Sequence, residues 1–182
     1  MWPVYQHGVG REKGDIDPVT FNIAPVEIGR AIGPQTRAVM LVHVDGNPCD
    51  MNAIMDICKR RNLILIEDCC EALGGFYNNI PVGKFGAVGT FSFYFSHHMT
   101  TLEGGVCVTE SFELAEMIRI LRAHGWVREL QEPNSHYEKF PDIDKRFLFI
   151  NQGYNLRLTE LQAACGPVQL PKLSPFVEAP RD

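Results

Sequence analysis

The sequence predicts an α/β protein with a mostly parallel sheet flanked by helices. Residues 37–44 (RAVMLVHV) form a continuous apolar run, which is typical of a strand buried on both faces. A second apolar run, at residues 63–70 (LILIEDCC), follows a segment with helical periodicity. Strand, helix and strand in this order form a βαβ unit with a right-handed crossover. The 182 residues, 45% of them hydrophobic, are enough for one sizeable core.

The helix between these strands is predicted over residues 51–62 (MNAIMDICKRRN). Asp50 precedes it and has the type of side chain that caps a helix N-terminus. Basic residues 59–61 fall near the C-terminal end, where they interact favourably with the helix dipole. The apolar side chains of the helix share one stripe, at Met51, Ile54, Met55 and Cys58.

Two more buried strands are predicted at residues 86–95 (GAVGTFSFYF) and 104–109 (GGVCVT). In both, β-branched and aromatic residues dominate between glycines. The next apolar periodicity predicts a helix over residues 112–124, with Ser111 as its cap and Gly125 as its stop.

The last third of the sequence is less regular. Residues 127–150 are polar and predict a long loop. Helical character resumes over residues 159–170 (TELQAACGPVQL), but Pro167 and Pro171 are expected to interrupt that helix.

Composition excludes several classes of protein. The net charge of -5 and the scattered basic residues provide no surface for nucleic acid. No stretch approaches the roughly 18 apolar residues of a membrane span, and the first residues lack a signal peptide, so we expect no membrane partner and a cytoplasmic location. The six cysteines lie in apolar runs without a CxxC motif, so we expect buried free thiols and no metal site.

Polar side chains cluster where two of the predicted strands end. Glu67, Asp68 and Glu71 follow LILI, and Ser92, His97 and His98 lie along or just beyond the strand that starts near residue 88. Open parallel sheets bind ligands at the carboxyl ends of their strands, so these groups are candidates for one crevice. From the residues alone, a turn carboxylate at Asp68 and two solvated turn histidines remain the alternative. Adjacent residues of an extended chain point to opposite sides, so the histidine pair does not predict a shared metal.

Three motifs resemble the DegT/DnrJ/EryC1/StrS family of pyridoxal-phosphate-dependent sugar aminotransferases. They are IEDCCEALGGFYNNIPVGKFGAVGTFSFYFSHHMTTLEGGVCVT, LRAHGW and GYNLRLTELQAACG. The resemblance implies the aspartate-aminotransferase (type I pyridoxal phosphate) fold, a nucleotide-linked keto sugar as substrate and a homodimer in the full-length form. It covers about residues 15–170, which we expect to be a partial large domain, between an atypical segment at 1–14 and an atypical tail at 171–182.

The resemblance also assigns roles to individual residues. Asp68 matches the aspartate that pairs with the pyridine nitrogen of the cofactor, where a carboxylate keeps that nitrogen protonated. Ser92 matches the serine that binds the cofactor phosphate, and Asn155 matches an asparagine that reaches the active site, commonly that of the neighbouring subunit. Glu71 stands where the family often carries Gln or His near the ring hydroxyl.

His97 falls where the family has the lysine that binds the cofactor covalently. This exchange resembles the 3-dehydratase branch, which holds pyridoxamine phosphate noncovalently and removes the C3 hydroxyl of a 4-keto-6-deoxy nucleotide sugar. The resemblance implies that His97 is the base, since an imidazole exchanges protons near neutral pH. His98 is expected to support the turn. Cys70 matches one ligand of the iron-sulfur cluster of a subgroup, but no cysteine follows between Cys107 and Cys165, so we expect no cluster.

Two alternatives stay open at this point. One is a sugar aminotransferase of the same family whose lysine comes from elsewhere, with Lys84 as the nearby candidate. The other is a catalytically inactive fragment that keeps the fold and dimerises with a relative. Asp68, Ser92, Glu103 and Asn155 are all present, which favours a working site in the synthesis of surface polysaccharide, lipopolysaccharide or deoxysugars.

Overall fold

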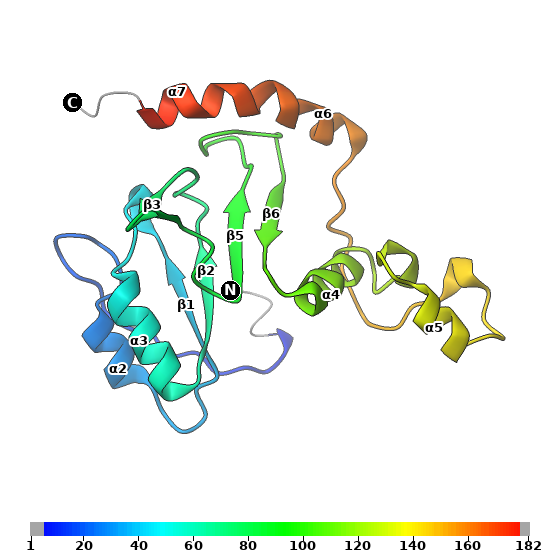
Figure 1. The fold of residues 1–182 in the computed structure, drawn as a ribbon, viewed down its shortest axis with the longest axis horizontal. Coiled ribbons are helices and arrows are strands. Elements are labelled where there is room, and N and C mark those ends of the chain that lie inside the picture. The colour runs from blue at the N-terminus through cyan, green and yellow to red at the C-terminus, as the bar shows by residue number, and fades with distance from the viewer. Residues whose placement is uncertain (1–5, 179–182) are drawn as a thin grey trace.

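The computed structural model describes residues 6–178. A four-stranded sheet has the order β1 (Ala38–Val42), β2 (Ile64–Asp68), β5 (Val88–Ser92) and β6 (Gly105–Val108). The pairs β1–β2 and β2–β5 are parallel, and β6 is antiparallel to β5 (Figure 1). The prediction of a mostly parallel α/β sheet is confirmed.

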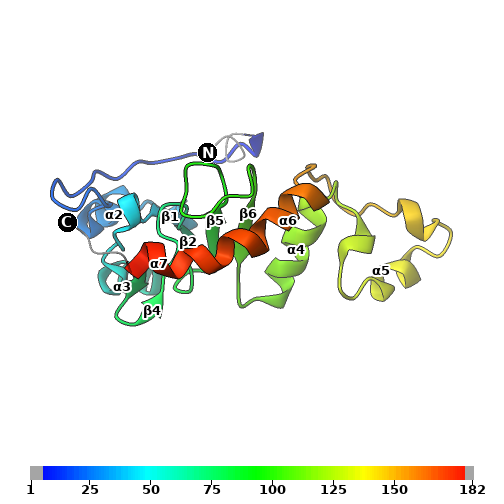
Figure 2. The ribbon, with the colours of Figure 1, turned by 90° about the horizontal axis from the view of Figure 1, so that it is seen from above.

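Helices α2 (Pro25–Ala31) and α3 (Met51–Arg61) form the main core with β1 and β2. Figure 2 shows α3 and α4 (Phe112–Arg122) on the same side of the sheet. The predicted caps are present, because the side chain of Asp50 accepts the N–H of Ala53 and the side chain of Ser111 accepts that of Leu114. The buried residues of the core are Ile28, Val39, Leu41, Cys49, Met51, Ile54, Cys58 and Leu65.

Shorter elements lie between and after these strands and helices, joined by loops. The predicted loop 127–150 carries several of them, so it is more ordered than its composition indicates. No helix in the described residues is long and apolar enough to cross a bilayer. The short elements are η1 (Val44–Gly46), β3 (Phe76–Tyr77), β4 (Ile80–Pro81), η2 (Val127–Glu129), α5 (Asn134–Lys139), η3 (Lys145–Phe147), α6 (Glu160–Gln169), η4 (Leu170–Lys172) and α7 (Leu173–Glu178).

The prediction that the strand at 37–44 is buried on both faces is wrong. In β1, buried and exposed side chains alternate, because α2 and α3 pack against one face of the sheet only. The other face, which we call the open face, carries Met40, Val42 and Ile64 with exposed fractions of 51%, 40% and 55%. An apolar run therefore identified the strand but not the number of its covered faces.

The prolines do not interrupt the last helix as expected. Pro167 lies inside α6, and α6, η4 and α7 follow one another without a break, with Gln169, Leu170 and Leu173 all in helical conformation (Figure 1). A proline removes one backbone donor from a helix. Here most of the surrounding helix surface is exposed, so the carbonyl group that loses its partner is accessible to water.

The cysteines differ in burial, and the expectation of six buried thiols is only partly correct. All six lie in the described residues and none is in a disulfide. Cys49, Cys58 and Cys69 are buried, whereas Cys70 and Cys165 are half-buried. Cys107 is exposed because the strand register aligns it, through Thr90 and Asp68, with Val42 on the open face.

Gly89 on β5 provides a test of the packing. A Cβ atom at this position would lie 2.5 Å from the Cα atom of Gly83, so Gly89→Ala should lower the free energy of unfolding by about 2–3 kcal/mol. Gly29 on α2 has no heavy atom within 4 Å of such a Cβ, and Gly29→Ala should raise stability by up to about 1 kcal/mol. Urea unfolding followed by circular dichroism measures both, and equal effects of the two changes would contradict the packing described here.

Candidate functional site

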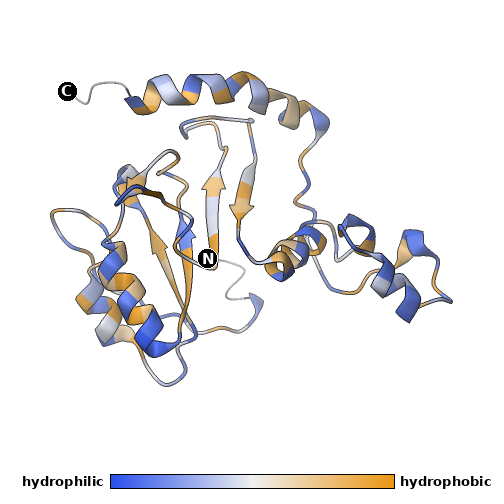
Figure 3. Cartoon of the chain, viewed as in Figure 1, coloured by the Kyte–Doolittle hydropathy of each residue, from blue (hydrophilic) through white to orange (hydrophobic). Residues whose placement is uncertain are grey.

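The carboxyl end of β2 places two acidic residues on opposite faces of the sheet. Along β2, Leu65 and Glu67 are buried on the helix-covered side, so Asp68 points to the open face. Figure 3 shows that β2 is apolar over most of its length and polar at its arrowhead.

Ser92 lies on the same face as Asp68. The register of the parallel pair sets Asp68 beside Thr90, and Ser92 follows two residues further along β5. Strand spacing and rise place the Cα atoms of Asp68 and Ser92 about 8 Å apart. The structure thus brings the residues predicted for the pyridine nitrogen and for the phosphate to one edge of one face.

Local contacts orient both side chains. Oδ1 of Asp68 accepts the N–H of Cys70 at 3.1 Å. Burial, together with a hydrogen bond to Asp68 and its charge, raises the pKa of the Cys70 thiol to about 12, so this thiol stays protonated. Oγ of Ser92 accepts the N–H of Tyr94 at 3.2 Å, which leaves the hydroxyl hydrogen of Ser92 for a ligand.

His97 and His98 lie in the loop 93–104, which begins directly after β5. The loop is closed at its base by hydrogen bonds from Phe93 to Gly104 and from Thr101 to Phe93, both of 2.9 Å between backbone N and O. The ring of His97 is half-buried and lies edge-on to Tyr94, with 6.3 Å between ring centroids, whereas His98 is exposed. The two adjacent histidines therefore have different environments, as their sequence positions predict.

Glu71 reaches the same edge of the sheet, but Asn155 does not. Oε2 of Glu71 accepts the N–H of Asp45 at 2.8 Å and so connects the turns that follow β1 and β2. Asn155 is exposed and pairs with Ala123 at the end of α4, in a segment that Figure 1 shows beyond β6. Within this chain, Asn155 does not contribute to the group around Asp68.

Lys84, the candidate lysine of the aminotransferase alternative, lies at the wrong end of the strand. It precedes β5, so it lies near the amino end of that strand, whereas Ser92 lies at the carboxyl end. Its Nζ atom is 3.6 Å from a carboxylate oxygen of Glu110. Lys84 therefore does not point toward the group around Asp68.

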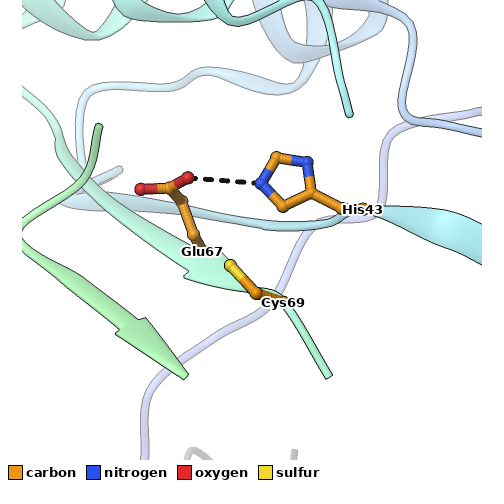
Figure 4. A group of neighbouring side chains, drawn as sticks. All are labelled: His43, Glu67 and Cys69. Carbon is orange, nitrogen blue, oxygen red and sulfur yellow. Dashed lines mark hydrogen bonds and ion pairs between the residues drawn. The ribbon is translucent and has the colours of Figure 1, made fainter. Parts of the chain in front are cut away.

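The sequence placed Glu67 with Asp68 among the candidates for one crevice, but the structure buries Glu67 on the helix-covered face, because neighbouring side chains of β2 point to opposite sides of the sheet. Glu67 and His43 are both fully buried, and their Oε2 and Nε2 atoms are 3.2 Å apart (Figure 4). The same Oε2 accepts the N–H of Gly83 at 2.8 Å, and Oε1 accepts those of Phe85 at 2.8 Å and Gly86 at 2.6 Å. We call this set of residues the Glu67 network. The sequence did not predict this network, and its one signal was a charged residue at a buried position of an apolar strand.

The network holds one negative charge without a positive partner. Nδ1 of His43 accepts the N–H of Cys49 at 3.1 Å, so the ring proton lies on Nε2 and points to Glu67, and the imidazole is neutral. Burial by itself raises the pKa of a carboxyl group. The hydrogen bonds from His43 and the three backbone amides outweigh it and hold the pKa of Glu67 below its ordinary value of 4.5.

His43, Glu67 and Cys69 resemble a metal site at first sight, since their ligand atoms lie within 4.8 Å of one another. Both nitrogens of His43 and both oxygens of Glu67 already form hydrogen bonds. Burial and the charge of Glu67 raise the pKa of the Cys69 thiol to about 12, whereas metals bind the thiolate. The cluster is therefore explained as a hydrogen-bonded network.

This sheet, with Asp68 and Ser92 at its carboxyl edge, defines the large domain of an aspartate-aminotransferase type of fold. The model of the DegT/DnrJ/EryC1/StrS aminotransferase family matches residues 5–182, and the chain belongs to this family. The family depends on pyridoxal phosphate, and the resemblance stated from the sequence is confirmed.

Three relatives illustrate the similarity. Over 182 residues the chain is 38% identical to the GDP-4-keto-6-deoxy-D-mannose 3-dehydratase of Yersinia pseudotuberculosis, covering 99% of this chain and 46% of that protein. The E. coli GDP-4-keto-6-deoxy-D-mannose-3-dehydratase with bound hydrated PLP superposes with a TM-score of 0.84, at 36% identity, over 97% of this chain and 46% of that one. The structure of an aminotransferase from Psychrobacter cryohalolentis superposes with a TM-score of 0.83, at 33% identity, over 96% of this chain and 43% of that one. The chain spans about half the length of these relatives.

The depressed pKa of Glu67 predicts a specific pH dependence. Above pH 4.5, the ordinary pKa, the charged network contributes fully, and its contribution falls as the pH drops through the lower folded pKa. Glu67→Gln should lower the free energy of unfolding by about 3 kcal/mol at pH 7. This difference in unfolding free energy from the unsubstituted chain should shrink below pH 4.5. Urea unfolding between pH 7 and pH 3 measures this difference. A difference that is constant or grows toward pH 3 contradicts a charged Glu67.

Proposed function

We propose that this chain carries the cofactor site of a pyridoxamine-phosphate-dependent 3-dehydratase that acts on a 4-keto-6-deoxy nucleotide sugar. The observation that supports this most is the position of His97 in the loop directly after β5, where the family lysine is expected. The loop 93–104 contains no lysine, and Lys84 lies near the amino end of the strand. A noncovalent cofactor is therefore favoured over a covalent one.

The described residues fit the cofactor. Asp68 and Ser92 lie on the same face, about 8 Å apart at their Cα atoms, which suits a pyridine ring with a phosphate ester. When bound, the cofactor supplies an electron-withdrawing ring that stabilises negative charge at the reacting carbon. Asp68 would hold the proton on the ring nitrogen, and the hydroxyl of Ser92 would donate to a phosphate oxygen.

His97 is the proposed base of the reaction. A neutral imidazole has a free lone pair near neutral pH, so His97 can take up a proton from C4′ of the bound cofactor. The half-buried ring beside Tyr94 limits its freedom to rotate away. Glu71 is the proposed neighbour of the ring hydroxyl, and its bond to Asp45 fixes its carboxylate at that edge. His98 is exposed, which agrees with a supporting place in the turn.

The proposed partners follow from the same comparison. Two of the relatives above carry a GDP-linked keto sugar in their names, which supports a nucleotide-linked keto sugar as substrate here. Asn155 is exposed and apart from Asp68, as expected if it serves the site of a second subunit, which supports a homodimer. We place this chemistry in the cytoplasm and in the synthesis of surface polysaccharide. The likeness to a solved aminotransferase keeps transamination as the second candidate.

Absorption spectroscopy tests the proposed site. The chain should retain pyridoxal phosphate or pyridoxamine phosphate after dialysis, and borohydride should fix no lysine adduct in proportion to the bound cofactor. Asp68→Asn should raise the dissociation constant at least about tenfold, because it removes a charged hydrogen bond. The control Asp56→Asn, on the exposed side of α3, should leave the dissociation constant within about twofold of that of the unsubstituted chain.

Two results would contradict this proposal. A stoichiometric lysine adduct supports the aminotransferase alternative. Failure of the chain to retain either cofactor supports the inactive-fragment alternative.

A further inference from the structure

The turn 83–86 folds back against the buried side of β2 and β5. Its amides at Gly83, Phe85 and Gly86 point at the carboxylate of Glu67. The approach is close, since a Cβ atom at Gly86 would lie 2.6 Å from the carbonyl oxygen of Leu65. Gly89 is the register partner of Glu67, and a Cβ atom at Gly89 would lie 2.5 Å from the Cα atom of Gly83. The turn is thus fitted to one position along β2.

We propose that Glu67 is a positioning residue for the site: its carboxylate fixes the register of β2 against β5, and this register sets Asp68 and Ser92 side by side on the open face. Glu67 itself points to the opposite face and touches neither a ligand nor Asp68. It acts through the backbone of the turn and the two strands.

Side-chain alternation explains why the register of β2 matters for Asp68. A slip of one residue would move each side chain to the other face, so Asp68 would enter the core and Glu67 would leave it. In the observed register, Glu67 faces the turn and accepts its amides with both carboxylate oxygens while its backbone stays in the strand. A buried carboxylate without its donors costs several kcal/mol, so the slipped arrangement is strongly disfavoured.

The turn also determines where β5 begins. The amide of Ala87, the residue directly after the turn, donates to the carbonyl of Leu65 at 2.8 Å. The ladder continues to the amide of Cys69, which donates to Thr90 at 2.8 Å. Because β5 is continuous from Val88 to Ser92, fixing its start also fixes the height of Ser92 relative to Asp68.

Hydrogen exchange of the unsubstituted chain without cofactor gives the first test. If the Glu67 network fixes the register, the amides of Gly83, Phe85 and Gly86 should exchange as slowly as those of β2 and β5, although they lie in a turn. Exchange at these three amides more than about 100-fold faster than in β2 would overturn the proposal, whether or not any variant folds.

Glu67→Gln, compared with Leu65→Ala, gives the second test. The side-chain NH₂ group of Gln would face two of the four hydrogen-bond donors that Glu67 accepts. The hydrogen-exchange rates of the turn and of β5 should therefore increase at least tenfold more than those of α3. Leu65→Ala removes a buried side chain that lies on the same face of the same strand and packs beside Gly86, but it removes none of the hydrogen-bonding groups of the network. It should therefore raise the exchange rates of all three regions together. The same pattern in both variants would mean that Glu67 contributes only general stability, and the proposal would be wrong.

The consequence for the cofactor, unlike the register itself, rests on the proposed function. At temperatures where both variants are folded by circular dichroism, Glu67→Gln should raise the dissociation constant of pyridoxal phosphate at least tenfold, and Leu65→Ala less than threefold. Equal affinities of the Glu67→Gln variant and the unsubstituted chain would overturn the positioning role. If the unsubstituted chain does not bind the cofactor, but β5 exchanges faster than α3 in the Glu67→Gln variant, the proposed function fails and the fixed register is supported.

Discussion

The buried carboxylate of Glu67 is the constraint on which this structure depends. A fully buried charge is stable only when its oxygens are hydrogen-bonded, and Glu67 obtains its donors from His43 and from a turn that follows β2 in the chain. Satisfying it requires β1, β2 and the turn before β5 to meet at one place. The face on which Asp68 lies follows from this arrangement, because neighbouring side chains of a strand point to opposite faces.

The same arrangement divides the sheet into two unlike faces. The helix-covered face holds the core and the Glu67 network, whereas the open face carries exposed apolar side chains such as Met40 and Val42 around Asp68. An apolar surface around one carboxylate suits an aromatic ring whose nitrogen needs a charged partner. It is also a surface that favours association, because contiguous exposed apolar patches typically mark sites of interaction.

Much of this fold could be predicted from local sequence. The apolar runs and the caps at Asp50 and Ser111 gave the strands and helices correctly, since these signals act within a few residues. The exposure of β1 could not be predicted, because it depends on what packs against the sheet rather than on the strand. The helix through Pro167 was missed because an internal proline was expected to end the helix, whereas it weakens a helix without always breaking it.

The site was predictable in part for the same physical reason. Asp68 and Ser92 could be brought together from the rule that parallel strands end at one edge. The donors of Glu67 could not be found, because backbone amides carry no side-chain signature and lie in a turn far along the chain. Asn155 also could not be placed, since its proposed contact belongs to a second subunit.

The exchange His97→Lys tests the central claim most directly, with His98→Lys as its matched neighbour. If residue 97 occupies the lysine position of the family, the His97→Lys variant with pyridoxal phosphate should turn yellow, and borohydride should fix the cofactor on residue 97. The His98→Lys variant should show no adduct in proportion to the bound cofactor, because residue 98 does not occupy the lysine position of the family. Equal labelling of both variants, or none at residue 97 while the unsubstituted chain retains the cofactor, would contradict the account.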